Sequence, residues 1–200
     1  MEQGGNVYDK YATSNPIERR LVGGFIEDLL ELVDRTGAQE AHEVGCGEGE
    51  LTMRLARRGL TARGSDLSAD VVAEAGRRAR EAGFEIPFKA AGITELGPEE
   101  DAAELIVCCE VLEHVDDPAR GLEVLATLAR PWLIVSVPRE PLWRGLNLAR
   151  LAYVSALGNT PGHLNHWSKG AFIRFLSDRV DVIETRSPLP WTMALCRVQG

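Results

Sequence analysis

Short apolar runs and amphipathic stretches alternate along the middle of the chain. Five runs are typical of buried strands, and they cover residues 41–44, 61–64, 86–90, 105–109 and 132–137. Between the runs, apolar residues recur every three or four positions, which is the spacing of one helix face. This alternation predicts an α/β domain whose parallel sheet is covered by helices on both faces. Ligands of such sheets bind at the carboxyl ends of the strands.

A helix precedes the first strand, and an irregular region follows the fifth. Residues 1–37 are expected to form an amino-terminal arm and an amphipathic helix that starts at Asn15. Residues 138–167 break the alternation, and an apolar stripe from Leu142 predicts a helix that ends at Gly158. Because this helical insertion leaves a strand at its carboxyl end, we expect it to cover the substrate pocket. A dimer face or a membrane-surface contact is the alternative use of its apolar stripe.

The carboxyl-terminal part returns to regular structure. Ser168 is expected to cap a helix, and the runs at 180–185 and 192–198 predict two closing strands that form a hairpin. A chain of 200 residues suits one domain with a full hydrophobic core, so residues 1–200 are expected to form a single domain.

Composition and charge narrow the classes of function. The net charge is −8, so long-range repulsion from phosphates argues against a general nucleic-acid binder. The amino-terminus lacks the basic and apolar regions of a signal peptide, and no apolar run has the length of a membrane span. The four cysteines lack metal-finger spacing. We therefore expect reduced thiols and a cytoplasmic protein.

The first strand runs into a glycine-rich turn with the sequence EVGCGEGE at residues 43–50. Its glycines, Gly45, Gly47 and Gly49, allow a sharp turn and let a ligand approach the backbone. A helix starts directly afterwards, so the turn also presents free N–H groups. The spacing differs from the G-x-G-x-x-G of a dinucleotide site. With Glu43 before it, the turn indicates a cationic, adenosine-like cofactor; a plain strand–turn–helix connection is the alternative.

Asp66 stands at the end of the second strand, about 20 residues after the glycine turn. A carboxylate there can accept hydrogen bonds from both hydroxyls of a ribose. Ser68 is better placed than Asp66 to cap the following helix. Nicotinamide enzymes use the same ribose contact. Asp66 therefore indicates adenosine binding but does not distinguish between cofactors that contain adenosine.

The glycine turn resembles that of class I S-adenosylmethionine-dependent methyltransferases, whose common form is an acidic residue followed by x-G-x-G-x-G. Residues 109–118, with the sequence CEVLEHVDDP, resemble the segment after the fourth strand in methyltransferases of the ubiquinone-biosynthesis type. Two such motifs in the right order are more specific than either alone. The resemblance covers nearly the whole chain. It implies a Rossmann-like seven-stranded sheet, mostly parallel with an antiparallel last strand.

The resemblance also implies the cofactor, S-adenosyl-L-methionine, with S-adenosyl-L-homocysteine as its product. The methionine end falls at the glycine turn, the ribose at Asp66, and the adenine at the turn after the third strand, where Gly92 replaces the family's common acidic residue. Tyr8 and Tyr11 are expected to help close the site. The predicted cofactor-binding residues are Tyr11, Glu43, Gly45, Cys46, Gly47, Gly49, Asp66, Leu67, Gly92, Ile93, Cys109 and Glu110.

Methyl transfer from a sulfonium is a direct displacement, so much of the catalysis is alignment of donor and acceptor. A base is needed only where the acceptor is a poor nucleophile as bound. The candidate catalytic residues are His163 and His166 in the insertion and His114 after the fourth strand. A histidine near neutrality can take a proton from a hydroxyl. The alternative is that His163 and His166 only fasten the insertion by hydrogen bonds, and that His114 orients the acceptor or only bonds to the backbone.

The predicted function is therefore a methyltransferase of class EC 2.1.1.- that acts on a small-molecule acceptor at oxygen. No bound metal, nucleic-acid partner or membrane span is expected, and a homodimer is one option. The sequence leaves the acceptor and its reacting atom open.

Other functions stay in competition with this one. Glu110, Glu113 and His114, with His163 or His166, suit a divalent ion such as manganese. That set is similar to the one in small-RNA 3′-terminal 2′-O-methyltransferases, although an acidic chain suits RNA poorly. A non-catalytic relative that works as an interaction module through the apolar insertion is another alternative. Nicotinamide binding is disfavoured by the glycine spacing.

Overall fold

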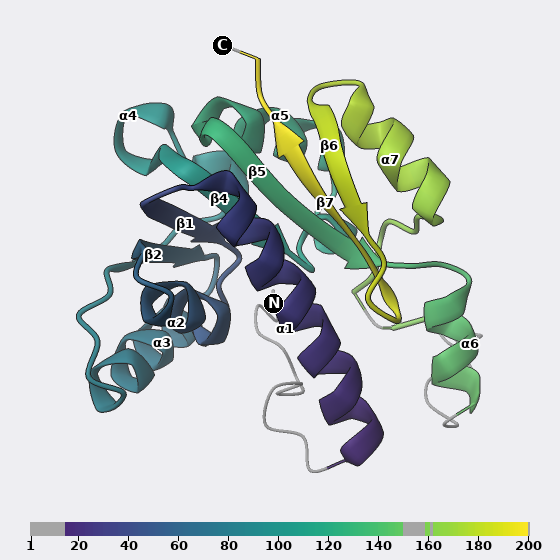
Figure 1. Cartoon of the computed structure of the whole chain (residues 1–200), viewed down its shortest axis with the longest axis horizontal. Coiled ribbons are helices and arrows are strands. Elements are labelled where there is room, and N and C mark those ends of the chain that lie inside the picture. Colours follow the sequence, from purple (N-terminus) through teal and green to yellow (C-terminus); the bar gives the residue numbers. More distant parts are fainter. Residues whose placement is uncertain (1–14, 150–158, 161, 200) are drawn as a thin grey trace.

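A seven-stranded sheet with helices on both faces forms the centre of the computed structural model, which describes residues 15–149, 159–160 and 162–199 (Figure 1). The strand order is β3-β2-β1-β4-β5-β7-β6, and β7 runs antiparallel to both of its neighbours. The predicted Rossmann-like sheet, mostly parallel with an antiparallel last strand, is confirmed. The strands are β1 (Glu40–Val44), β2 (Thr61–Asp66), β3 (Phe88–Ala90), β4 (Ala103–Cys109), β5 (Ala129–Pro138), β6 (Asp181–Arg186) and β7 (Trp191–Arg197).

Polar side chains begin several of the helices at the predicted places. Asn15, Ser68, Asp117 and Ser168 each accept a hydrogen bond from a backbone N–H in the first turn of the helix that follows. The helices are α1 (Pro16–Thr36), α2 (Glu50–Arg57), α3 (Ala69–Glu81), α4 (Pro98–Asp101), α5 (Pro118–Leu128), α6 (Leu142–Ala149) and α7 (Lys169–Ser177), with 3₁₀ turns η1 (Ile93–Glu95) and η2 (Leu112–His114).

The two faces of the sheet bury separate hydrophobic cores. On one face, α1 and α2 pack through residues such as Phe25, Leu29 and Leu55 against alternate residues of β4 and β7. On the other face, α5 and α7 supply Leu122 and Phe172, among others. In Figure 1, α1 crosses the front of the sheet and α6 stands beyond the β6–β7 hairpin. The rigid sheet thus fixes the strand ends that carry the site.

Element boundaries differ from the sequence prediction at a few places. The third strand is shorter than expected, since pairing with β2 begins at Phe88; Pro87 just before it has no N–H to donate. The fifth strand is longer, because Ala129 already pairs with Ala103 and the antiparallel pairing with β7 extends to Pro138. The short turns η1, α4 and η2 were not predicted.

Two sequence predictions concern residues outside the described ones. The helix expected up to Gly158 is described as α6 as far as Ala149, and residues 150–158 lie outside the description. Tyr8 and Tyr11 of the amino-terminal arm also lie outside it.

Within residues 15–149, 159–160 and 162–199, no helix combines the length and the apolar character that crossing a membrane requires.

Candidate functional site

The strand order reverses between β1 and β4, which are neighbours in the sheet although the chain connects them through β2 and β3. In sheets of this kind the ligand crevice lies at such a reversal, outside the carboxyl ends of the strands. The glycine turn follows β1, and Glu110 follows β4. Both predicted segments therefore meet at the place where a ligand is expected.

The glycine turn is held by β2 and has one open position. Gly45 N and Cys46 N both donate to the carbonyl oxygen of Ser65, at 2.7 and 2.9 Å. A Cβ on Gly45 would lie 2.2 Å from Cγ2 of Val111, so close packing requires glycine there. Gly47 has a φ of +53°, and a Cβ on it would meet no atom within 4 Å. The half-buried Gly47 thus leaves open space beside the turn that a ligand could enter.

Asp66 joins the glycine turn to the end of β2. Its Oδ2 accepts from Gly47 N at 2.9 Å, and its Oδ1 accepts from Ser68 N at 3.1 Å. A carboxylate has about four acceptor positions, so both oxygens can still accept from ribose hydroxyls. Next to it, the Leu67 side chain is 57% exposed and its Cδ1 would lie 3.2 Å from a Cβ on Gly92. The predicted ribose and adenine residues are therefore neighbours.

Three other predicted cofactor residues support the turn from inside the fold. The Glu43 carboxylate is buried and accepts a hydrogen bond from Thr52 Oγ1 in α2. Cys46 is buried as well, and this burial raises the pKa of its thiol, which is unreactive as a result. The Ile93 side chain contacts α5, since its Cδ1 would lie 3.3 Å from a Cβ on Gly121. Ile93 therefore packs against the hydrophobic core in addition to following the adenine turn.

Glu110 adopts a backbone conformation that is rare for a residue with a side chain. Its φ is +62°, which costs about 1–2 kcal/mol outside glycine. The side chain is held at both oxygens: Oε1 accepts from Ser136 Oγ at 3.1 Å and Oε2 from Trp191 Nε1 at 2.6 Å. The preceding residue, Cys109, is buried at the end of β4. Backbone strain that the surroundings hold in place is typical of functional sites.

A row of rings lies beside Glu110 and leads toward the insertion. Trp191 contacts Phe25 of α1, with ring centroids 5.1 Å apart, and Trp143 of α6, at 5.9 Å. Trp143 in turn stacks on His163, at 6.1 Å. Trp143 Nε1 donates to Thr160 Oγ1 at 2.9 Å, which fixes α6 against the segment that carries His163. These four rings, tilted by 28–63° against one another, form a ring wall next to the predicted cofactor residues.

The segment with His163 and His166 is fastened to η2, mainly through main-chain groups. Leu164 N and Asn165 N both donate to the Glu113 carbonyl, at 2.8 and 3.0 Å. The Asn165 amide donates to the carbonyls of Leu112 and Val115, at 3.1 and 2.6 Å. The fastening that the sequence suggested for the histidines is thus carried largely by Asn165.

The three predicted catalytic histidines lie together. His114 Nδ1 is 2.9 Å from the Gly162 carbonyl oxygen, which can only accept, so Nδ1 carries the proton and Nε2 has the lone pair. The rings of His114 and His163 are 4.9 Å apart, and those of His163 and His166 are 6.5 Å apart. The arrangement can accept a proton from, or bind, a polar group of a substrate on the ring wall.

Charge and burial keep two of these imidazoles neutral. Burial lowers the pKa of His163 to about 4, assisted by His114, His166 and Arg144. The pKa of His166 is lowered by burial and by Arg144, while Glu140 opposes this, with its Oε1 3.9 Å from His166 Nδ1. His163 is therefore a weak base and a good neutral ligand.

Three of the residues suggested as ligands in the alternative metal site lie close together. Ligand atoms of Glu113, His114 and His163 all lie within 4.8 Å of one another, and Glu113 and His163 are buried. Glu110 and His166 are not members of this cluster. The sequence motif suggested Glu110 as a ligand together with Glu113, but the left-handed φ of Glu110 directs its carboxylate to Ser136 and Trp191 instead.

Several residues of the site carry no motif in the sequence. Ser65, Ser136 and Trp191 hold the glycine turn and Glu110 from neighbouring strands. Ser136, inside the apolar run of β5, is a weak sign of a buried hydrogen bond, because a buried hydroxyl needs a partner. Trp191 has no such signal, since its contact with Glu110 joins residues 81 positions apart.

Comparison with known proteins identifies the family. Residues 41–131 match the family model described as a methyltransferase domain. A ubiquinone biosynthesis O-methyltransferase from Paracidovorax citrulli is 33% identical over 175 residues, which cover 82% of this chain and 70% of that protein. The chain belongs to the class I S-adenosylmethionine-dependent methyltransferases. The enzyme of the same name from Methylococcus capsulatus is 36% identical over 54% of this chain, but the match spans only 44% of that relative's length.

Solved methyltransferase structures have the same fold. Magnesium protoporphyrin IX methyltransferase from Synechocystis, with bound S-adenosylhomocysteine, has a TM-score of 0.73 at 21% identity and covers 95% of this chain and 91% of its own. The N-methyltransferase NodS from Bradyrhizobium japonicum has a TM-score of 0.68 at 19% identity, with 94% and 99% covered. At these identities, the structural similarity shows the methyltransferase fold and does not identify the acceptor. The acceptor is therefore inferred from the site itself.

Proposed function

We propose that the chain transfers a methyl group from S-adenosylmethionine to an oxygen of a small-molecule acceptor. The observation that carries this is the hydrogen bond between Asp66 and the open glycine, Gly47. It joins a ribose-binding carboxylate to a backbone that a ligand can approach, at the strand reversal of the sheet. The names of the curated relatives, ubiquinone biosynthesis O-methyltransferases, support oxygen as the reacting atom.

The cofactor, when bound, supplies an electrophilic methyl group on a sulfonium. The chain's own residues fit such a group: Gly47 leaves room, Asp66 accepts from ribose hydroxyls, and Leu67 offers an exposed apolar side chain to the adenine. Gly45 lets Val111 approach and close the turn from the β4 side. Glu110 holds Trp191 in place and so sets the position of the ring wall relative to the turn.

The ring wall supports a partly apolar acceptor. The half-buried Trp143 would contact such a molecule, with the buried rings of Trp191 and His163 packed beside it, and the rings would exclude water from the transfer. We propose His114 as the residue that accepts the proton of the acceptor hydroxyl, because its Nδ1 donates to Gly162 and its Nε2 is therefore the basic nitrogen of the ring. His163 and His166 would bind and orient the acceptor as neutral imidazoles.

A second candidate is metal-assisted transfer to the same class of acceptor, and the cluster of Glu113, His114 and His163 favours it. One carboxylate and two imidazoles suit manganese, zinc or iron. The hydrogen bond from His114 Nδ1 to the Gly162 carbonyl is the kind that orients a ligating imidazole. RNA as the acceptor is not favoured, since the curated relatives carry names of small-molecule enzymes. A cytoplasmic location and a homodimer stay predictions from the sequence.

Calorimetric titration with S-adenosylhomocysteine tests the proposed function, with NAD as the control ligand. We expect micromolar binding by the wild-type protein and no binding of NAD. Asp66→Ala should weaken binding at least about tenfold, since hydrogen bonds to a charged group contribute about 1.5–3 kcal/mol each. Asp70→Ala, at an exposed acid in the first turn of α3, is the matched control and should bind normally. No binding to folded wild-type protein would favour the non-catalytic interaction module.

A further inference from the structure

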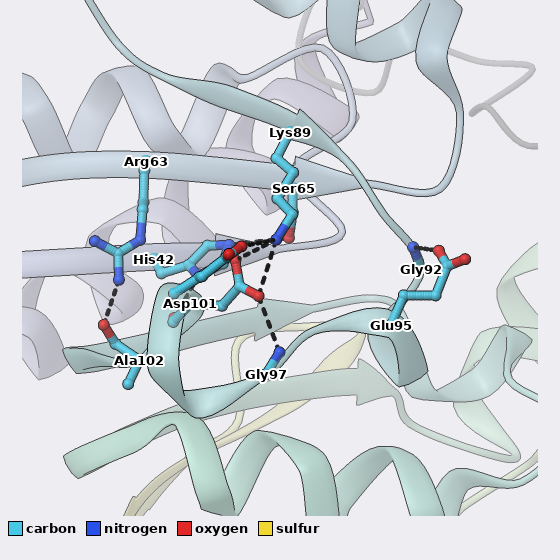
Figure 2. A network of polar contacts seen from close by, with 10 residues as sticks. His42, Arg63, Ser65, Lys89, Gly92, Glu95, Gly97, Asp101 and Ala102 are labelled. Atoms are coloured by element: carbon cyan, nitrogen blue, oxygen red, sulfur yellow. Dashed lines mark hydrogen bonds and ion pairs between the residues drawn. The ribbon is translucent and has the colours of Figure 1, made fainter.

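A polar network, buried at His42, Ser65 and Asp101, joins β1, β2, α4 and the exposed Lys89 of β3 (Figure 2). At its centre is His42 of β1, which is 1% exposed. Its Nδ1 lies 2.8 Å from the Asp101 carbonyl oxygen, and its Nε2 lies 2.9 Å from Ser65 Oγ. A carbonyl oxygen only accepts, so Nδ1 carries the proton and the Ser65 hydroxyl donates to Nε2. The tautomer of His42 is therefore set by its two partners.

The Ser65 end of the network reaches the glycine turn. The carbonyl oxygen of Ser65 accepts from both Gly45 N and Cys46 N, which are the first amides of the turn. The side chain of the same residue is bonded to His42. His42 thus fixes the residue of β2 to which the glycine turn is attached.

The Asp101 end of the network reaches the adenine turn. The Asp101 carboxylate accepts from Gly97 N at 2.9 Å and from Lys89 Nζ at 2.9 and 3.1 Å. Gly97 ends the loop that begins at Gly92, where the backbone N–H donates to Glu95 Oε2 at 2.6 Å. Figure 2 shows Gly97 and Lys89 meeting at the Asp101 carboxylate. The far end of the adenine turn is held in this way.

We infer that His42 is a positioning residue for the cofactor, which it does not contact. By hydrogen bonding to Ser65 and Asp101, His42 fixes the distance between the glycine turn and the adenine turn. This rests on the proposed function, since S-adenosylmethionine would span both turns. Burying an imidazole costs folding free energy unless the ring is hydrogen-bonded. The preceding residue of β1, Ala41, is apolar and buried, so His42 stands out as a polar residue in this strand. Holding both halves of the site in the bound geometry lowers the cost of ordering them on binding.

The test compares two ligands on matched variants. His42→Phe keeps a buried ring but loses both hydrogen bonds, whereas His42→Gln keeps a donor and an acceptor; Ser65→Ala removes only the hydroxyl. We expect the Kd of S-adenosylhomocysteine to rise about tenfold in His42→Phe and Ser65→Ala, with partial recovery in His42→Gln. The Kd of adenosine, which lacks the part that reaches the glycine turn, should change less than about twofold.

A control variant separates positioning from stability. Thr36→Val removes the hydroxyl bond to the Val33 carbonyl, 2.6 Å long, at the end of α1 away from both turns. Thr36→Val should lower the free energy of unfolding, measured by urea denaturation, without changing the Kd of S-adenosylhomocysteine or of adenosine. Folded His42→Phe with wild-type affinity, or an equal loss for adenosine and S-adenosylhomocysteine, would overturn the inference alone. Wild-type protein that binds no S-adenosylhomocysteine would overturn the proposed function and this inference together.

Discussion

Oε2 of Glu110 accepts a hydrogen bond of 2.6 Å from Nε1 of Trp191 and so ties the end of β4 to the start of β7. The contact spans β5, whose Ser136 binds the other carboxylate oxygen. It holds a left-handed residue next to the glycine turn and a tryptophan in the ring wall. One carboxylate therefore joins the proposed cofactor side of the site to the proposed acceptor side.

Trp191→Phe should destabilise the protein, because it keeps the ring but leaves one oxygen of Glu110 without its indole donor. We expect the free energy of unfolding to fall by about 1.5–3 kcal/mol, the contribution of a hydrogen bond to a charged group. Urea denaturation measures this loss. Trp132→Phe, at a ring that contacts Arg197 instead, is the control and should lose less. Equal losses in the two variants would show that the Glu110 contact adds nothing.

Two glycines of the turn should respond differently to alanine. Gly45→Ala places a methyl group against Val111 at a positive φ of +76°, so it should cost about 3 kcal/mol of stability or more. Gly47→Ala meets open space and should cost only the φ penalty, about 1–2 kcal/mol. It should nevertheless weaken S-adenosylhomocysteine binding at least about tenfold, because the methyl group fills the ligand's space. Calorimetry and urea denaturation on the same samples check both; a Gly47→Ala variant with normal affinity would contradict the proposed cofactor position.

The lowered pKa of His163 should make stability depend on pH. Its folded-state pKa is about 4 against an ordinary value of 6.5, so the unfolded chain takes up the proton first as the pH falls. The free energy of unfolding should therefore decrease from pH 6.5 to 4, by at most about 3 kcal/mol from this group. Urea denaturation of wild type and His163→Phe across this range, in buffer with a chelator, isolates the contribution. Parallel pH profiles would show that His163 is not held neutral by the fold.

Metal binding has a direct test in the second candidate function. If Glu113, His114 and His163 hold an ion, titration with Mn²⁺ alone should show one site in the wild-type protein. His163→Ala should weaken it at least about tenfold, whereas His166→Ala, outside the cluster, should bind normally. Absence of Mn²⁺ and Zn²⁺ binding by the wild type would leave metal-free transfer as the mechanism.

Local patterns in the sequence predict the parts of this protein that depend on neighbouring residues. The helix caps at Asn15, Ser68 and Ser168 and the glycine turn follow from the spacing of a few positions. The left-handed Glu110 does not, because it is held by Ser136 and Trp191, which reach it only through the sheet.

The same limit applies to the polar network and the ring wall. His42 looks like an ordinary buried residue of a strand, and its partners Ser65 and Asp101 are 23 and 59 positions away. Predicting such contacts requires the register of β1 against β2, which the apolar pattern alone does not specify. Local motifs therefore suggest candidate cofactor residues, whereas the residues that hold those candidates in place become visible only in the structure.

The segment around Asn165 is attached to η2 through the carbonyls of Leu112, Glu113 and Val115. Such carbonyls are present whatever side chains occupy those positions. None of these hydrogen bonds uses the side chain of His163 or His166. Substitutions at these two histidines should therefore alter the chemistry of the segment while its attachment to η2 stays in place.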